Sequence, residues 1–303
     1  MSPPAFVAPG RRAGVTGFRM PRAGGRARYD LVTPDGRTHE RHDDVTGSMA
    51  DPQPDRPAEH VGGDRRHVLL AFAPYLLVSI AHVAALAAGL DDVARLSKLV
   101  LMPALVLAVM LGLRPLRGLA PALLLVAIVL SWGGDASLTL AGDLWFVVGL
   151  ASFLLAHVAY IALFLRMPGG GPRLPAWTAC YAVWYLVFLA MLGPHLGALL
   201  APVAVYGLVL GAMAALAGRV GGLIATGGAL FVVSDSVLAL GRFLPGYDFG
   251  PHDVVVMSTY VAAQGLIALG VVKGYRGGVS SRRDEATTTA SPGAGRVAGS
   301  ANP

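Results

Sequence analysis

The chain has 303 residues, of which 54% are hydrophobic and only 14% are charged, and its formal net charge is +6. Soluble globular domains are about one-quarter charged. This composition, with a mean hydropathy of +0.60, excludes an ordinary soluble domain and indicates an integral membrane protein. The single cysteine, Cys180, excludes a disulfide within the chain and metal sites built from paired thiols.

The two ends of the chain differ from its middle. Residues 1–66 are rich in Arg, Gly, Pro and Asp and contain no sustained apolar run. We expect this segment to be a disordered, basic cytoplasmic leader, and residues 273–303 to be a disordered cytoplasmic tail. Neither end contains a recognisable nucleic-acid-binding fold, so we expect no nucleic-acid partner. Residues 67–272 form the predicted membrane domain.

The membrane domain is a series of apolar runs, each near the roughly 20 residues that a helix needs to cross a bilayer core. Eight runs follow one another, at about 67–88, 97–113, 118–140, 144–165, 175–192, 198–217, 221–241 and 252–272. The short connections favour a compact bundle in which consecutive helices are antiparallel. The sequence therefore predicts an all-α polytopic membrane bundle of eight transmembrane helices.

Basic residues predict the orientation of this bundle. With the leader inside the cell, the inner connections carry Arg114, Arg117, Arg166, Arg173 and Arg219. Every inner connection then obeys the positive-inside rule, which only an even number of spans allows. We expect both termini to be cytoplasmic and the chain to be a multi-pass protein of the cell membrane, in contact with membrane lipids.

Two acidic residues lie inside apolar runs rather than at their ends, Asp135 in 118–140 and Asp235 in 221–241. A carboxylate in hydrocarbon costs roughly 2.5–3.5 kcal/mol even on insertion scales, so such an acid indicates a functional site. Both lie about 8 Å below the outer ends of spans that run in the same direction. Two carboxyls at one depth can share a proton and so supply a general acid and a general base. Each could instead be a hydrogen-bond partner that joins two helices.

Seven other polar residues lie in the same half of the membrane, at its rim or one turn deeper, and are candidate substrate-binding residues: His82, Lys98, Ser131, Ser234, Arg242, Tyr260 and Gln264. A lysine at the end of a span also commonly reaches the headgroups, and a buried histidine commonly packs between helices. The sequence has no pair of His residues at i, i+4 and no Gly-x-Ser-x-Gly elbow. We expect no metal and no cofactor.

Six short motifs follow one another along the spans: Ser97-Lys98, Ser131-Trp-Gly-Gly-Asp135, His157-x-x-Tyr160, Pro202-Val-x-x-Tyr206, Ser234-Asp235-x-x-Leu238-Ala239 and Tyr260-x-x-Ala263-Gln264. In this order and spacing, the chain resembles the YhhN-type membrane proteins, the lysoplasmalogenase family, over roughly residues 70–272. The resemblance implies hydrolysis of the vinyl ether bond of a lysoplasmalogen. The substrate would be a lysophospholipid, and the products a fatty aldehyde and glycerophosphoethanolamine or glycerophosphocholine.

The residues suit that chemistry. A vinyl ether resists nucleophiles but is cleaved once its enol carbon is protonated, because water captures the resulting oxocarbenium ion. The reaction needs one carboxyl that donates a proton and one carboxylate that steadies the cation and activates water, as in a glycosidase. We assign this pair to Asp135 and Asp235, without deciding which is the acid, and expect Lys98, His82 and Arg242 to meet the headgroup phosphate.

Two other functions would also account for the two acids inside the membrane. Paired membrane carboxyls also serve proton-coupled transporters of small molecules or lipids. A transporter is expected to have helices interrupted near the midplane, for which Gly133-Gly134 and Gly227-Gly228 are the candidate positions. A non-catalytic membrane scaffold or lipid-binding protein would need the two acids only for stability.

Overall fold

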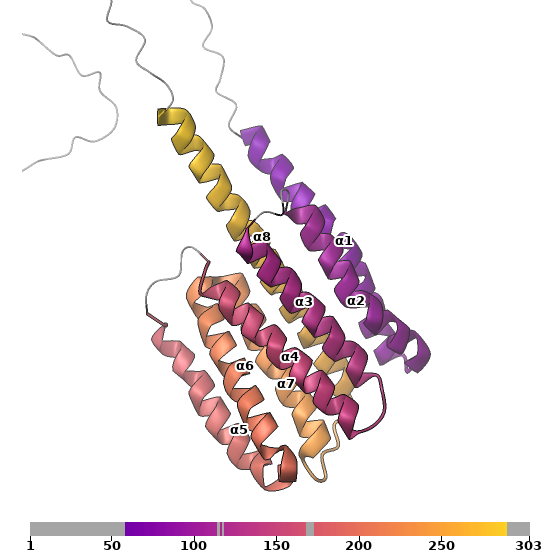
Figure 1. Cartoon of the computed structure of the whole chain (residues 1–303). Helices are drawn as coiled ribbons and strands as arrows, with labels where there is room; N and C mark the ends of the chain where they lie inside the picture. Colours follow the sequence, from indigo (N-terminus) through magenta and orange to yellow (C-terminus); the bar gives the residue numbers. More distant parts are fainter. Residues whose placement is uncertain (1–57, 114–115, 117, 168–172, 290–303) are drawn as a thin grey trace, which may run out of the picture. The chain divides into compact units, whose positions relative to one another are not determined.

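The long elements of the protein are all α-helices, as the computed structural model shows for residues 58–113, 116, 118–167 and 173–289 (Figure 1). Their bounds are α1 Ala58–Ala87, α2 Asp91–Gly112, α3 Leu119–Leu138, α4 Asp143–Phe164, α5 Cys180–Leu196, α6 Leu200–Val220, α7 Gly222–Phe243 and α8 His252–Thr289. No strand occurs in these ranges. A helix satisfies each backbone N–H and C=O within one segment, as hydrocarbon requires of a spanning chain. The predicted all-α bundle is confirmed.

Seven helical segments of the described chain are long and apolar enough to cross a membrane. One of them, Ala176–Val220, has 45 residues and contains both α5 and α6. These two helices meet at a short 3₁₀ turn, Gly197–Leu199, and pack against each other. Gly197 has a φ of 50°, a left-handed conformation that glycine adopts readily, so the chain reverses there. Each of the eight predicted segments therefore corresponds to one helix.

Consecutive helices pack side by side, in the pairs α1 with α2, α3 with α4, α5 with α6 and α7 with α8. The four connections within these pairs lie at one end of the bundle, and the start of α1 and the end of α8 lie at the other (Figure 1). This arrangement has the even number of passes that the predicted orientation requires. The cytoplasmic location of the termini stays a prediction.

The first and last helices extend past the predicted boundaries of the membrane domain. α1 begins at Ala58, within the segment predicted as a leader, and α8 continues to Thr289, within the segment predicted as a tail. Helix therefore covers part of both predicted tails. Residues 1–57 and 290–303, on which the rest of those predictions falls, lie outside the described residues.

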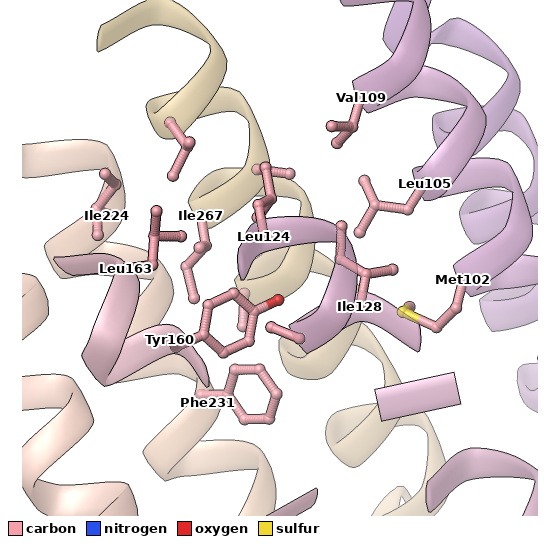
Figure 2. Packing of buried hydrophobic residues seen from close by; sticks show 14 of the residues in the cluster. Met102, Leu105, Val109, Leu124, Ile128, Tyr160, Leu163, Ile224, Phe231 and Ile267 are labelled. Atoms are coloured by element: carbon pink, nitrogen blue, oxygen red, sulfur yellow. The ribbon is translucent and has the colours of Figure 1, made fainter. Parts of the chain in front are cut away.

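The buried core is formed mainly by α1, α2, α3, α4, α6, α7 and α8. Figure 2 shows its side chains, among them Met102, Leu105, Val109, Leu124, Ile128, Tyr160, Leu163, Ile224, Phe231 and Ile267. Many leucines and valines on the outside of the bundle, such as Leu144 and Leu186, are exposed. Lipid tails are as apolar as leucine, so helix association depends on close packing rather than on transfer out of water.

α7 and α8 approach each other closely at Gly227. A Cβ atom at this position would lie 2.7 Å from Cγ1 of Ile267 and 2.9 Å from the backbone oxygen of Ala263. Only glycine leaves room for α8 at this distance. The contact sets the height of α7 against α8, and with it the relative height of Asp235 and Tyr260 in the site described below.

Replacing Gly227 by alanine tests this packing. We expect Gly227→Ala to lower the free energy of unfolding in detergent by about 1–3 kcal/mol, the usual cost of overpacking. Gly222→Ala, on the same helix, is the control because its Cβ would meet nothing within 4 Å. Equal stability of the two variants would show that the approach at Gly227 is not a tight contact.

Candidate active site

Asp135 and Asp235 line the same cavity, to which every helix from α2 to α8 contributes. Asp135 comes from α3 and is 2% exposed, whereas Asp235 comes from α7 and is half-buried. The polar residues of the lining are Lys98, Asp135, Tyr206, Ser234, Asp235 and Tyr260. The rest of the wall is apolar. The two acids that the sequence singled out are thus brought together by helices that are about 100 residues apart in the chain.

Each carboxylate oxygen of Asp135 has a different partner. The hydroxyl of Tyr260, on α8, donates a hydrogen bond to Oδ2 at 2.6 Å. The ammonium of Lys98, on α2, lies 3.8 Å from Oδ1, and the lysine side chain is 20% exposed. A buried carboxylate needs such partners because its desolvation costs several kcal/mol. Lys98 therefore acts on Asp135 directly, inside the cavity.

Asp235 is held by a different helix and by a neutral donor. The hydroxyl of Tyr206, on α6, donates a hydrogen bond of 2.5 Å to its Oδ2. Tyr206 belongs to one of the sequence motifs but was not among the predicted site residues. A signal was available, because the hydroxyl of a tyrosine inside an apolar helix needs a polar partner, but which acid it meets depends on how α6 packs against α7.

Behind Tyr260 lies a second layer of hydrogen bonds. The hydroxyl of Tyr160, on α4, donates to Oε1 of Gln264 at 2.5 Å. The amide nitrogen of Gln264 in turn faces the hydroxyl of Tyr260 at 3.4 Å. Gln264 is fully buried and is absent from the cavity wall. The structure therefore places this predicted substrate-binding residue one layer behind the cavity, against Tyr260.

Two predicted binding residues, Ser131 on α3 and Ser234 on α7, lie on the same helices as the two acids. Ser234 lines the cavity, but its hydroxyl donates to the backbone oxygen of Val256 at 3.0 Å and so joins α7 to α8. Ser131 lies one turn before Asp135, is fully buried, and is not among the lining residues. Its hydroxyl has no hydrogen-bond partner within the described part of the chain.

The structure does not bring His82 to the cavity. His82 is buried between α1 and α2, where its Nδ1 lies 2.9 Å from the hydroxyl of Ser97. This is the helix-packing arrangement that the sequence also allowed for a buried histidine. A direct contact between His82 and a substrate phosphate has no support in this geometry.

Arg242 lies at the rim of the cavity rather than in its wall. Its guanidinium donates to Oδ1 of Asp143 at 2.5 Å and lies 5.0 Å from the ring centroid of Phe146. Phe146 and Phe243, which pack edge to face at 5.7 Å, both line the cavity. Arg242 therefore covers the aromatic residues at the end of the bundle where α3 joins α4 and α7 joins α8.

Most of the apolar wall is built from residues of four helices: Phe146, Leu150 and Phe153 of α4, Trp184 and Phe188 of α5, Val203 and Leu210 of α6, and Leu238, Ala239 and Phe243 of α7. Leu138 of α3 and Val256 and Met257 of α8 complete it. A wall of this composition, with a few polar groups in it, suits a ligand with a hydrocarbon chain. Within the described ranges, no group of three or more His, Cys, Asp or Glu side chains is placed to hold a metal ion.

Fold and site together define a polytopic helical membrane protein with two carboxyls in an apolar, membrane-embedded cavity. Comparison with known sequences identifies its family: residues 93–271 match the YhhN family, and the chain belongs to that family. The matched range contains both acids, Lys98, Tyr206 and Tyr260 but not His82.

Two curated relatives are similar to most of this membrane domain. The human protein "Lysoplasmalogenase TMEM86B" is 36% identical over 184 residues, which cover 57% of this chain and 73% of the human protein. "Lysoplasmalogenase" of Mycobacterium tuberculosis (strain CDC 1551 / Oshkosh) is 36% identical over 194 residues, which cover 60% of this chain and 70% of the mycobacterial protein. No solved structure matches the chain significantly.

The exposure of the Arg242–Asp143 pair predicts how firmly it is held. The two side chains are 45% and 86% exposed, and exposed ion pairs usually contribute about 0.2–1 kcal/mol. A double-mutant cycle of Asp143→Asn and Arg242→Gln, followed by unfolding in detergent, should give a coupling free energy in that range. A coupling above about 2 kcal/mol would contradict this and make the pair a fixed part of the fold.

Proposed function

We propose that this protein hydrolyses the vinyl ether bond of lysoplasmalogens and releases a fatty aldehyde and the corresponding glycerophospho-alcohol. The observation that carries the proposal is the joint presence of Asp135 and Asp235 in one largely apolar cavity. Its support from relatives is the identity of 36% to proteins named lysoplasmalogenase in two distant organisms. The preferred substrates are the alkenyl lysophospholipids with an ethanolamine or choline headgroup.

The reaction balances with the two carboxyls and one water. One carboxyl donates its proton to C2 of the vinyl ether, and the resulting oxocarbenium ion faces the other carboxylate. That carboxylate takes a proton from water as the water oxygen bonds to C1, which gives a hemiacetal. The hemiacetal collapses when its ether oxygen is protonated and leaves as the alcohol, while its hydroxyl proton returns to the first carboxyl. Each carboxyl ends the cycle in its starting state.

The cavity orients the substrate along the bundle. The aromatic and aliphatic wall on α4, α5, α6 and α7 takes the hydrocarbon chain, and the headgroup then lies at the rim. Arg242 is the basic group at that rim, and the weakness expected of its exposed pair with Asp143 leaves it free to bind phosphate. Such a substrate reaches the site from the lipid phase, which fits the proposed location in the cell membrane.

A proton-coupled carrier would also use paired membrane carboxyls, but its binding helices are expected to be interrupted. In this structure α3 runs without a break through Gly133 and Gly134, and α7 runs without a break through Gly227 and Gly228. The candidate interruptions are thus continuous helix. No feature of the described chain favours the carrier over the hydrolase.

The amide variants of the two acids test the proposal. In detergent, we expect the wild-type protein to release aldehyde from an alkenyl lysophospholipid and none from the acyl counterpart. Asp135→Asn and Asp235→Asn should each lower kcat at least about 100-fold, the usual contribution of a general acid or base. Asp248→Asn is the matched control, because Asp248 is exposed and lies outside the cavity.

Two results would contradict the proposal. One is near wild-type turnover by either cavity variant when it is folded. The other is a folded wild-type protein that releases no aldehyde from alkenyl lysophospholipids with an ethanolamine or choline headgroup.

A further inference from the structure

The two carboxyls have unequal surroundings. Asp135 receives a hydrogen bond from Tyr260 and also lies 3.8 Å from the ammonium of Lys98. Asp235 receives a hydrogen bond from Tyr206, with no cation beside it in the described part of the chain. Lys98 is the only basic side chain among the described residues that line the cavity. The cavity thus holds two potential negative charges and one positive charge.

Electrostatics decides how those charges are arranged. Two carboxylates in a low-dielectric cavity with a single cation cannot both remain ionised at little cost, because like charges repel strongly there. The carboxyl nearer the cation keeps its negative charge, since the ion pair offsets part of its desolvation. The neighbour that has only a neutral donor is the one that holds a proton. By this criterion Asp135 is the ionised member and Asp235 is the neutral one.

The hydrogen bonds behind Tyr260 fix the direction of its bond to Asp135. Tyr160 donates its only hydroxyl proton to the oxygen of Gln264, which leaves the amide N–H of Gln264 directed at the oxygen of Tyr260. Tyr260 therefore accepts from Gln264 and must donate its own proton to Asp135. Oδ2 of Asp135 is therefore an acceptor, as it must be if Asp135 is ionised.

Exposure to the cavity separates the two acids as well. Asp135 is 2% exposed, whereas Asp235 is half-buried and lies in the wall beside Leu238 and Ala239. Tyr206 contacts only Oδ2 of Asp235, so Oδ1 is the oxygen available to carry a proton toward a bound chain. A proton donor needs this access, because it must reach the substrate carbon.

We propose that Asp235 is the proton donor and that Asp135, paired with Lys98, is the ionised carboxylate that activates water. The inference rests on the proposed function for its chemical meaning. In the reaction, Asp235 gives its proton to C2 of the vinyl ether and Asp135 takes one from water. Collapse of the hemiacetal moves a proton from Asp135 to the leaving oxygen and one from the hydroxyl back to Asp235, so both start again as before.

Infrared spectroscopy of the purified protein tests the assignment without any turnover. A protonated carboxyl gives a carbonyl stretching band that carboxylates lack, and the frequency of this band rises when a hydrogen bond to its carbonyl oxygen is removed. We expect such a band at neutral pH, which Asp235→Asn abolishes. Tyr206→Phe should shift the band to higher frequency, whereas the matched variant Tyr260→Phe should leave it in place.

Amide variants alone cannot make the assignment, because removing either carboxyl also removes the repulsion that keeps the other one neutral. The tyrosine variants leave both carboxyls present, and each removes one hydroxyl that contacts a single acid. A band that shifts in Tyr260→Phe and not in Tyr206→Phe would reverse the roles. A band that shifts in both variants or in neither, or no band in the wild type, would overturn the assignment of a localised proton to Asp235.

Lys98 provides a second, independent arm. Lys98→Met should add a second protonated carboxyl to the spectrum, because Asp135 loses its cation, whereas Lys98→Arg should leave one. An unchanged spectrum in a folded Lys98→Met protein would show that Lys98 does not set the charge of Asp135. The proposed activity is measured separately as aldehyde release. An active enzyme whose band shifts in Tyr260→Phe and not in Tyr206→Phe would therefore refute the assignment and leave the function standing.

Discussion

The structure depends on keeping two carboxyls inside a bundle whose outer surface is hydrocarbon-like. Each acid costs roughly 2.5–3.5 kcal/mol to place in a membrane even on insertion scales, so each must be compensated by partners from other helices. Asp135 obtains Tyr260 from α8 and Lys98 from α2, and Asp235 obtains Tyr206 from α6. These contacts connect the helices α2, α3, α6, α7 and α8 around one cavity. The packing of the bundle therefore determines whether the two acids are compensated.

Close packing makes those contacts possible. At Gly227 the absence of a side chain lets α8 approach α7, and the hydroxyl of Ser234 then reaches the backbone oxygen of Val256 on α8. The result is a cavity with a few polar groups in a wall that is otherwise aromatic and aliphatic. That combination suits an amphipathic lipid, since the chain needs an apolar wall and the vinyl ether needs a proton donor placed within reach.

Much of the fold was predictable from local sequence, because a long apolar segment in hydrocarbon must form a helix to satisfy its backbone hydrogen bonds. The two acids were predictable for the complementary reason that charge is rare inside such segments. Tyr206 and the position of Gln264 behind Tyr260 were not, since they depend on which faces of distant helices meet. His82 was wrongly predicted to lie in the site for the same reason. Its depth in the membrane suggested a place there, but the packing of α1 on α2 brings it to Ser97 instead.

The central claim is that a carboxyl in this cavity protonates a vinyl ether carbon and that water then adds to the neighbouring carbon. The most direct measurement is mass spectrometry of both products from a reaction in D₂¹⁸O, with the aldehyde reduced at once. The account predicts one deuterium at C2 of the released chain and no ¹⁸O in the glycerophospho product. Glycerophospho product that carries ¹⁸O would mean that water attacks the glycerol side of the ether, and it would contradict the account.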